Sequence, residues 1–335
     1  MTILISGGAG FLGQRLARAL IKDQAVAPGP SNEQSDGGTK LLLVDILEPV
    51  EPIPGAQHVT GDITDPSFLA SVLTEDVTSI FHLAAIVSSH AESDYDLGMK
   101  VNFDATRAIV ERARALKTRP TLIFTSSVAV FGIPRQELHD ANSIRKRQLS
   151  FTETTAITPQ SSYGAEKGMA ELLVADATRK GFIDGRAVRL PTVVVRPGKP
   201  NKAASSFASG IIREPLQGQP SVCPVDLDTP VWIQSPRKVV ENLIRAHKLP
   251  AGTGPLVITL PGLSVTAGEL VDAMVRAGGR RELVRLEKQP DIERIVSSWP
   301  GRIETPVASS LGFEADRSID DVVQAFVQDD LKMSR

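Results

Sequence analysis

The chain has 335 residues, which allows two domains or one large domain with an appended lobe, and its 41% of hydrophobic residues is too high for a disordered chain. It carries 37 Lys and Arg against 39 Asp and Glu, a net charge of −2, so no positive excess favours nucleic acid or an anionic membrane as a partner. The single cysteine, Cys223, excludes an internal disulfide and a thiolate metal cluster, and it fits a reducing, cytoplasmic compartment.

The chain begins with MTILISGGAGF, which lacks the basic region of a signal peptide, and no window approaches the ~20 apolar residues of a membrane span. Short apolar runs then alternate with helical patterns. Strands are expected at 2–6, 41–44, 79–83, 121–124, 185–190 and 192–195, with long helices at 14–22, 101–116 and 163–177. Uniformly apolar strands separated by helices predict a parallel sheet covered on both faces, hence a Rossmann-type, doubly wound α/β domain.

The pattern changes after about residue 195, where polar, turn-rich sequence is followed by short strands and helices. We therefore expect a Rossmann domain at 1–195 and a smaller C-terminal lobe at 196–335, from which strands can return to the main sheet. Residues 23–39 are rich in Gly, Pro, Ser and Asn and predict a long surface loop. That loop is either an interaction segment or a tolerated insertion, since surface loops accept added length at little cost.

A glycine cluster directly follows the first strand. Its residues, with the two that open the next helix, are Gly7, Gly8, Gly10, Phe11, Leu12 and Gly13. Glycines here permit a tight turn and let backbone N–H groups approach a pyrophosphate, which the positive end of the helix dipole also attracts. Glycine clusters also occur in purely structural turns, but the position between a first strand and a first helix favours a dinucleotide-binding loop.

Asp45 ends the second strand. A carboxylate there accepts hydrogen bonds from ribose hydroxyls and repels a 2′-phosphate, which favours NAD over NADP; the alternative is a capping or surface aspartate. Asp45 lies 32 residues after Gly13 (45 − 13), farther than the ~20 expected, and the long loop accounts for the excess. Asp62, followed by Ile63, comes after the apparent third strand and either bonds the adenine amine or caps the next helix.

Tyr163 and Lys167 lie four residues apart where a helix opens, and so on one helical face. An ammonium beside a phenol stabilises the phenolate, so we expect the pKa of Tyr163 to fall towards neutrality, as a general acid or base requires. Ser127, at the end of the preceding strand, can hydrogen-bond the same substrate oxygen. The Tyr-x-x-x-Lys spacing also arises by chance, from an interface tyrosine and an ordinary surface lysine.

These features occur in one order along the chain, together with His82-Leu83-Ala84-Ala85 and Asn102. In that order, over roughly the first 200 residues, they resemble the extended short-chain dehydrogenase/reductase superfamily, which includes NAD-dependent nucleotide-sugar epimerases and dehydratases. The resemblance implies that Tyr163 is the acid/base and that Lys167 binds the nicotinamide ribose. It also implies that Ser127 orients the substrate and that Asn102 organises the site and its water. The implied NAD-binding residues are Gly7, Gly10, Phe11, Leu12, Gly13, Asp45, Asp62, Ile63, Ala84, Ala85, Tyr163, Lys167 and Pro191.

A narrower resemblance begins at Arg189-Leu190-Pro191-Thr192 and continues to Leu216. This stretch is similar to a branch of the superfamily, the D-erythronate dehydrogenases, whereas nucleotide-sugar enzymes usually carry an Asn- and Gly-rich stretch here. The resemblance implies oxidation of D-erythronate at C2, giving 2-oxo-D-erythronate (2-dehydro-D-erythronate) and NADH, with Tyr163 taking the C2 hydroxyl proton. Residues 1–195 would then bind NAD, and 196–335 would mainly bind substrate.

A small anionic substrate needs donors for its carboxylate, and polar residues cluster where the second lobe should face the cofactor. The residues expected to bind substrate are Ser127, Tyr163, Thr192, Asn201, Lys202 and Arg213. Each polar residue of the lobe has the alternative of being merely solvated.

Three functions remain open. An NAD-dependent dehydrogenase of a small sugar acid would release NADH, whereas a nucleotide-sugar epimerase or dehydratase would retain its NAD and form little. A non-catalytic NAD-sensing protein would not need Tyr163, Lys167 and Ser127 together. The five histidines lack metal-ligand spacing, so no catalytic metal is expected. The superfamily resemblance also implies a homodimer formed through the helices at 101–116 and 163–177.

Overall fold

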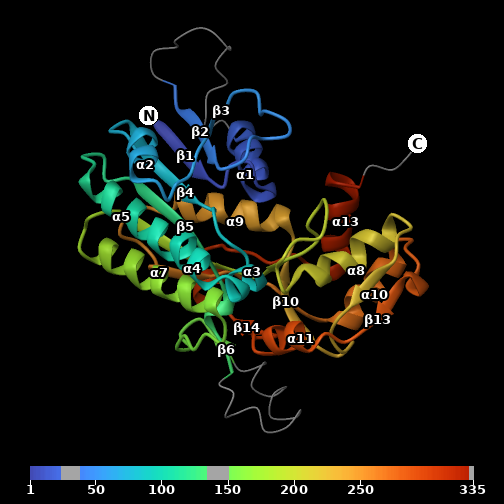
Figure 1. Ribbon diagram of the computed structural model, residues 1–335. Helices are drawn as coiled ribbons and strands as arrows, with labels where there is room; N and C mark the ends of the chain where they lie inside the picture. Colours follow the sequence, from blue (N-terminus) through green and yellow to red (C-terminus); the bar gives the residue numbers. More distant parts are fainter. Residues whose placement is uncertain (24–37, 134–150, 332–335) are drawn as a thin grey trace.

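The centre of the molecule is a seven-stranded parallel sheet (Figure 1). The computed structural model describes residues 1–23, 38–133 and 151–331, so most of the predicted loop at 23–39 lies outside the described residues. The strands are β1 (Thr2–Ser6), β2 (Lys40–Asp45), β3 (Gln57–Thr60), β4 (Val77–His82), β5 (Thr121–Ser127), β7 (Asp184–Leu190) and β11 (Val257–Thr259). Their order is β3-β2-β1-β4-β5-β7-β11, and every pairing is parallel. The predicted Rossmann-type α/β fold is confirmed.

Helices cover both faces of this sheet, which is why the inner strands are apolar throughout rather than alternating. Helices α1 (Phe11–Lys22) and α9 (Pro236–Lys248) pack on one face, where residues such as Leu16 and Leu243 share a core with Ile5. Helices α2 (Pro66–Val72), α5 (Ala105–Ala115) and α7 (Ser162–Arg179) pack on the other. The sheet is therefore rigid on both sides, and its strand ends are fixed in space.

The strand order reverses between β1 and β4. The chain passes from β1 outward to β2 and β3, then returns to the other side of β1 through β4 and β5. In open α/β sheets a crevice forms at such a switch point, beyond the carboxyl ends of the strands, and ligands bind there. The glycine loop after β1 and Ser127 at the end of β5 both lie at this edge.

Part of the chain after residue 195 returns to the main sheet. Strand β11 pairs with β7, and α9 covers the sheet beside α1. The remainder forms a smaller lobe with its own core, to the right in Figure 1. Its elements include α8 (Ser206–Leu216), β9 (Ser221–Cys223), β10 (Pro230–Gln234), β12 (Leu263–Thr266), α10 (Ala267–Arg276), β13 (Val284–Leu286), α11 (Pro290–Ser297) and α13 (Ile319–Asp329). The short strand β8 (Thr192–Val193), just before this part of the chain, pairs with β10. Two short strands, β6 (Phe151–Thr152) and β14 (Ile303–Glu304), pair with each other, and α12 (Pro306–Ser310) packs near α9.

Across the ranges that the structure describes, no helix has the length and apolarity needed to cross a membrane.

The segment at 101–116 differs from the single helix expected. Two short helices, α3 (Ser88–Ser93) and α4 (Tyr95–Gly98), lead into a π-helix, Met99–Asp104, which continues as α5. A π-turn inserts one residue into the helical repeat, so apolar periodicity does not reveal it, and such turns are frequent at functional sites. Here the turn carries Asn102, which is fully buried.

Candidate active site

A cavity of about 300 Å³ lies at the switch point between the main sheet and the smaller lobe. The glycine loop, the segment after β4, the end of β5, the start of α7 and the chain after β7 all contribute to its wall. The lining includes Gly7, Gly10, Phe11, Leu12, Gly13, Leu83, Ala85, Ser88, Thr125, Ser126, Ser127, Tyr163, Lys167, Pro191, Thr192, Arg196, Asn201, Ser205 and Trp299. Residues far apart in sequence therefore meet in one hollow.

The glycine loop has the shape of a pyrophosphate cradle. Gly7 has a positive φ of 73°, and a Cβ on Gly13 would lie 2.2 Å from the Gly7 carbonyl oxygen, so only glycine allows this tight turn. Gly10 is the N-cap of α1 and supplies no capping side chain, and the first turn of the helix holds no acidic residue. The N–H groups and the positive helix dipole are thus available to an anion. The residues present fit a dinucleotide.

Asp45 lies beside this loop. Its Oδ2 accepts a hydrogen bond from the Ala9 amide at 3.1 Å, and its Oδ1 accepts one from the Leu47 amide at 3.1 Å. These bonds hold the carboxylate at the carboxyl end of β2, where a ribose reader is required. Asp45 is not the N-cap of α1, and it does not line the cavity; nor do Ile63 and Ala84.

The two alternatives for Asp62 are separated by the structure. Helix α2 is capped by Asp65, which accepts hydrogen bonds from the amides of Ser67 and Phe68. The capping role considered for Asp62 is therefore wrong. Asp62 is exposed, outside the cavity wall, and its Oδ1 accepts a bond from the Thr64 amide at 2.8 Å. It remains a candidate for contact with the adenine end of a dinucleotide.

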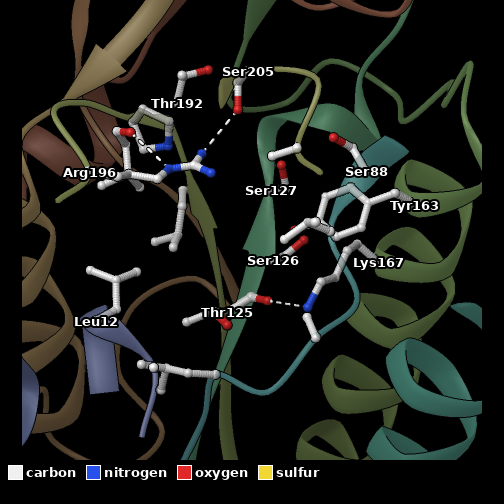
Figure 2. A pocket seen from close by; sticks show the side chains of 18 of the residues that line it. Leu12, Ser88, Thr125, Ser126, Ser127, Tyr163, Lys167, Thr192, Arg196 and Ser205 are labelled. Atoms are coloured by element: carbon white, nitrogen blue, oxygen red, sulfur yellow. Dashed lines mark hydrogen bonds between the residues drawn. The ribbon is translucent and has the colours of Figure 1, made fainter. Parts of the chain in front are cut away.

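Ser127, Tyr163 and Lys167 gather on one side of the cavity (Figure 2). Ser161 caps α7 by accepting a bond from the Gly164 amide, so the helix begins at Ser162 and directs the tyrosine and the lysine to one face. Lys167 is fully buried, and its Nζ donates to the Thr125 carbonyl at 2.9 Å and lies 5.7 Å from the centroid of the Tyr163 ring. The predicted neighbours are thus brought together, with the lysine anchored to β5.

The expected lowering of the Tyr163 pKa by Lys167 is not found. Burial raises the pKa of Tyr163 to about 12, opposed by the Arg196 guanidinium and by a hydrogen bond with the Ser127 hydroxyl. Burial also lowers the pKa of Lys167 to about 8, which the nearby carboxylates of Glu166 and Glu171 oppose. The Arg196 charge therefore favours the Tyr163 phenolate, while Lys167, with a pKa of about 8, still carries its charge in most molecules at pH 7.

Asn102 stands behind the cavity, outside its wall. Its amide Nδ2 donates to the Ile86 carbonyl at 3.0 Å and to Glu166 Oε2 at 2.6 Å, while its Oδ1 accepts from the Ile86 amide at 2.8 Å. All of this side chain's bonds join the loop after β4 to α7. Asn102 is a positioning residue in this arrangement, and the role implied for it in organising the site and its water stays a prediction.

The expected substrate-binding residues separate into two groups. Thr192 and Asn201 line the cavity with Ser127 and Tyr163, whereas Lys202 and Arg213 do not. Lys202 is exposed, and Arg213 is buried where it binds Glu214 Oε1 at 2.5 Å and the Arg196 carbonyl at 2.6 Å. Arg213 is thus occupied by partners within the protein.

Ser205, which sequence reasoning grouped with the carboxylate donors, also lines the cavity. Other lining residues were not among the candidates for the site, and these include Ser88, Arg196 and Trp299. Arg196 is the most informative of them, because it places a cation in the cavity. The sequence could have indicated Arg196 as a site residue, since it directly follows an apolar run at the carboxyl side of the sheet, where functional residues of such folds concentrate. Within the described part of the chain, no three His, Cys, Asp or Glu side chains gather as metal ligands do.

Comparison with known proteins gives consistent results. The model of the NAD dependent epimerase/dehydratase family matches residues 3–232. The chain is 44% identical over 338 residues to the D-erythronate dehydrogenase of Cupriavidus necator, with 98% of each chain covered. It is 43% identical over 339 residues to the D-erythronate dehydrogenase of Haemophilus influenzae, covering 99% of this chain and 100% of that one.

Solved structures agree. A nucleoside-diphosphate-sugar epimerase from Agrobacterium tumefaciens is 36% identical with a TM-score of 0.81, covering 98% of this chain and 94% of the other. L-threonine 3-dehydrogenase from Trypanosoma brucei, at 23% identity and a TM-score of 0.81, shares the fold over 97% of this chain and 95% of its own. The chain therefore belongs to the NAD-dependent epimerase/dehydratase family, within the extended short-chain dehydrogenases/reductases, and is an NAD-dependent oxidoreductase.

Proposed function

We propose that the protein oxidises D-erythronate at C2, so that D-erythronate and NAD⁺ give 2-oxo-D-erythronate, NADH and a proton. The observation that carries this proposal is the 43–44% identity, over nearly the whole chain, to two proteins named D-erythronate dehydrogenase. Ser127, Tyr163 and Lys167 in one cavity support it, because an alcohol oxidation needs a group to hold the hydroxyl and a group to accept its proton.

Bound NAD would supply the acceptor for the hydride that leaves C2. The chain's own residues then have three tasks. Ser127 hydrogen-bonds the C2 hydroxyl, and Tyr163 accepts its proton as the C2–O bond becomes a carbonyl. Lys167, held against the Thr125 carbonyl, lies beside the Tyr163 ring and contributes its charge and its donors to the site. The glycine loop, Asp45 and Pro191 hold the cofactor, with Asp62 towards the adenine.

Acid/base work by Tyr163 depends on its protonation state. With a pKa raised to about 12 by burial, Tyr163 is mostly neutral at pH 7. Oxidation requires the phenolate, so the rate of NADH formation should rise with pH on the alkaline side of neutrality. The Arg196 charge and the Ser127 hydroxyl both act in the direction that helps, because each lowers the pKa of Tyr163.

The test is to mix purified protein with NAD and D-erythronate and to record NADH absorbance, then to identify the product as a 2-oxo acid by derivatisation and mass spectrometry.

The second candidate function is that of a nucleotide-sugar epimerase, favoured by the 36% identity to the Agrobacterium structure of that name. No NADH from D-erythronate, together with epimerisation of UDP-glucose or UDP-arabinose, would replace the first proposal by the second. Binding of NAD without either reaction would favour an NAD sensor.

We also propose a homodimer through the outer faces of α5 and α7. The side chain of Leu172 on α7 is 65% exposed and that of Met169 is 37% exposed, which is unusual for large apolar residues on neighbouring turns of one helix. Light scattering after size exclusion should give twice the chain mass of 35.9 kDa, and Leu172→Glu should give the monomer. A wild-type monomer would contradict the proposed homodimer.

The cytoplasmic location stays a prediction from the single cysteine.

A further inference from the structure

We propose that Arg196 binds the carboxylate of the substrate, so that the cavity selects small 2-hydroxy acids over neutral polyols of the same size. This inference rests on the proposed function, which leaves open which side chain recognises the acid. It also departs from the expectation that Lys202 and Arg213 do so.

The first argument is charge pairing. In the described part of the chain three arginines are buried, and each has a carboxylate partner. Arg186 lies 3.1 Å from Asp184, Arg189 lies 2.8 Å from Glu171, and Arg213 lies 2.5 Å from Glu214. A guanidinium removed from water is costly unless an anion compensates its charge, so this pairing is the rule to expect.

Arg196 breaks that rule. Among the residues that the structure describes, no carboxylate lies within ion-pair distance of it, and its side-chain partners are neutral. Its Nε donates to the Val193 carbonyl at 3.1 Å, and its Nη2 donates to the Ser205 hydroxyl at 3.0 Å. Two of the five guanidinium N–H groups are used in this way. The remaining guanidinium N–H groups have no hydrogen-bond partner within the described residues. Arg196 is partly buried in the cavity wall, so an anionic ligand bound there would compensate its charge.

The second argument is position. Figure 2 shows Ser127 between Arg196 and Tyr163, with the guanidinium reaching towards the serine. Arg196 and Tyr163 act on each other electrostatically: the cation lowers the pKa of the phenol, and the phenolate raises that of the guanidinium. A 2-hydroxy acid carries its hydroxyl and its carboxylate on adjacent carbons. A site for it therefore needs a hydroxyl-binding pair next to an anion-binding group, and this wall supplies both.

The third argument is preorganisation. The Arg196 amide donates to Ser209 Oγ at 3.0 Å, and its carbonyl accepts from Arg213 Nη1 at 2.6 Å. Its backbone is thus fixed by α8, and its side chain by Val193 and Ser205. A planar guanidinium held in place can bind both oxygens of a carboxylate with little loss of freedom. Arg213 acts here as support for Arg196, which explains its own burial.

The experiment compares two substrates that differ only in the charged group: D-erythronate and its neutral reduced analogue, erythritol. For each, kcat/KM with saturating NAD is measured in wild type, Arg196→Gln, Arg196→Lys and Lys202→Gln. We expect wild type to prefer D-erythronate. Arg196→Gln should slow both substrates, since it removes a charge that lowers the pKa of Tyr163, but kcat/KM should fall ~100-fold or more further on D-erythronate than on erythritol. Arg196→Lys keeps the positive charge but loses the planar guanidinium that can bind both carboxylate oxygens. Its kcat/KM on D-erythronate should therefore lie between those of wild type and Arg196→Gln. Lys202→Gln, which removes the exposed lysine outside the cavity, should keep the wild-type preference.

A second readout needs no turnover. Trp299 lines the cavity, so D-erythronate added to the protein–NADH complex should change tryptophan fluorescence in wild type and Lys202→Gln but not in Arg196→Gln. Retained preference or retained binding in Arg196→Gln, or their loss in Lys202→Gln, overturns the inference. If wild type forms no NADH from D-erythronate but binds it through Arg196, the proposed reaction fails while the carboxylate site stands. Unchanged NAD binding verifies that each variant is folded.

Discussion

Arg189 on β7 and Glu171 on α7 form a buried ion pair with two parallel hydrogen bonds, from Nε to Oε1 at 2.9 Å and from Nη2 to Oε2 at 2.8 Å. The Ser126 hydroxyl donates to the same Oε1 at 2.5 Å, and the guanidinium lies 4.6 Å from the Phe131 ring centroid. This pair joins α7, which carries Tyr163, to β7, and the Ser126 bond links it to the end of β5. It therefore supports the geometry of the active site without lining the cavity.

Glu171→Gln should destabilise the fold strongly, because it leaves the Arg189 charge buried without a counter-ion. We expect a loss of ~3–5 kcal/mol in the free energy of unfolding, measured by urea denaturation. The comparison is Asp176→Asn on the same helix, which removes an exposed pair with Arg179 and should cost less than ~1 kcal/mol. Equal losses in the two variants would mean that the buried pair adds nothing to stability.

Tyr163→Phe should abolish oxidation while keeping the cofactor. Removing one acid/base group typically slows a reaction by ~10²–10⁴-fold, and here no other hydroxyl of comparable acidity lines the cavity beside Lys167. NAD affinity, measured by calorimetry, should change little, because the glycine loop and Asp45 are untouched. Turnover within ten-fold of wild type would remove Tyr163 from the acid/base role.

Much of the fold followed from local sequence. The apolar runs, the glycine turn after β1 and the Tyr163–Lys167 spacing depend on residues close together in the chain, and the structure bears out the sheet that they predict. The π-helix around Asn102 did not follow, because one inserted residue leaves the apolar pattern nearly unchanged. The Asn102 bonds to Ile86 and Glu166 that accompany it join segments distant in sequence.

The charges in the cavity wall could not be predicted from the sequence in the same way. Glu214 directly follows Arg213 in the sequence, but the fold is needed to show that the two pair and that Arg196 lines the cavity. The pKa of Tyr163 is a similar case. The sequence supplied the neighbouring lysine, but the desolvation that dominates that pKa comes from packing of the whole site.

Asp45→Ser should weaken the preference for NAD over NADP. The Asp45 carboxylate is held at the end of β2 by the amides of Ala9 and Leu47, where its charge opposes a 2′-phosphate. The ratio of kcat/KM for NAD to that for NADP should fall by at least ~10-fold, since a like charge is removed. Asp62→Asn is the comparison and should leave the ratio unchanged, because Asp62 is exposed and held by its own turn. An unchanged ratio in Asp45→Ser would show that another group reads the ribose.

His82 should make the fold sensitive to acid. Burial, with a smaller effect of the Lys167 charge, lowers the pKa of His82 from 6.5 to about 3. The ring is fixed as a neutral group, with Nδ1 2.6 Å from Ser6 Oγ and Nε2 3.0 Å from Thr106 Oγ1. Between these two pKa values the unfolded chain binds a proton that the folded protein does not, so the free energy of unfolding falls as the pH falls.

From pH 7 to pH 5 this effect amounts to ~2 kcal/mol, at ~1.4 kcal/mol per pH unit below the unfolded pKa. His82→Gln replaces the ring by an amide that does not titrate and that can still bond to a hydroxyl. The variant should therefore lose less stability over this range than wild type, as urea midpoints at several pH values would record. Parallel pH profiles for wild type and His82→Gln would show that the acid sensitivity arises elsewhere in the molecule.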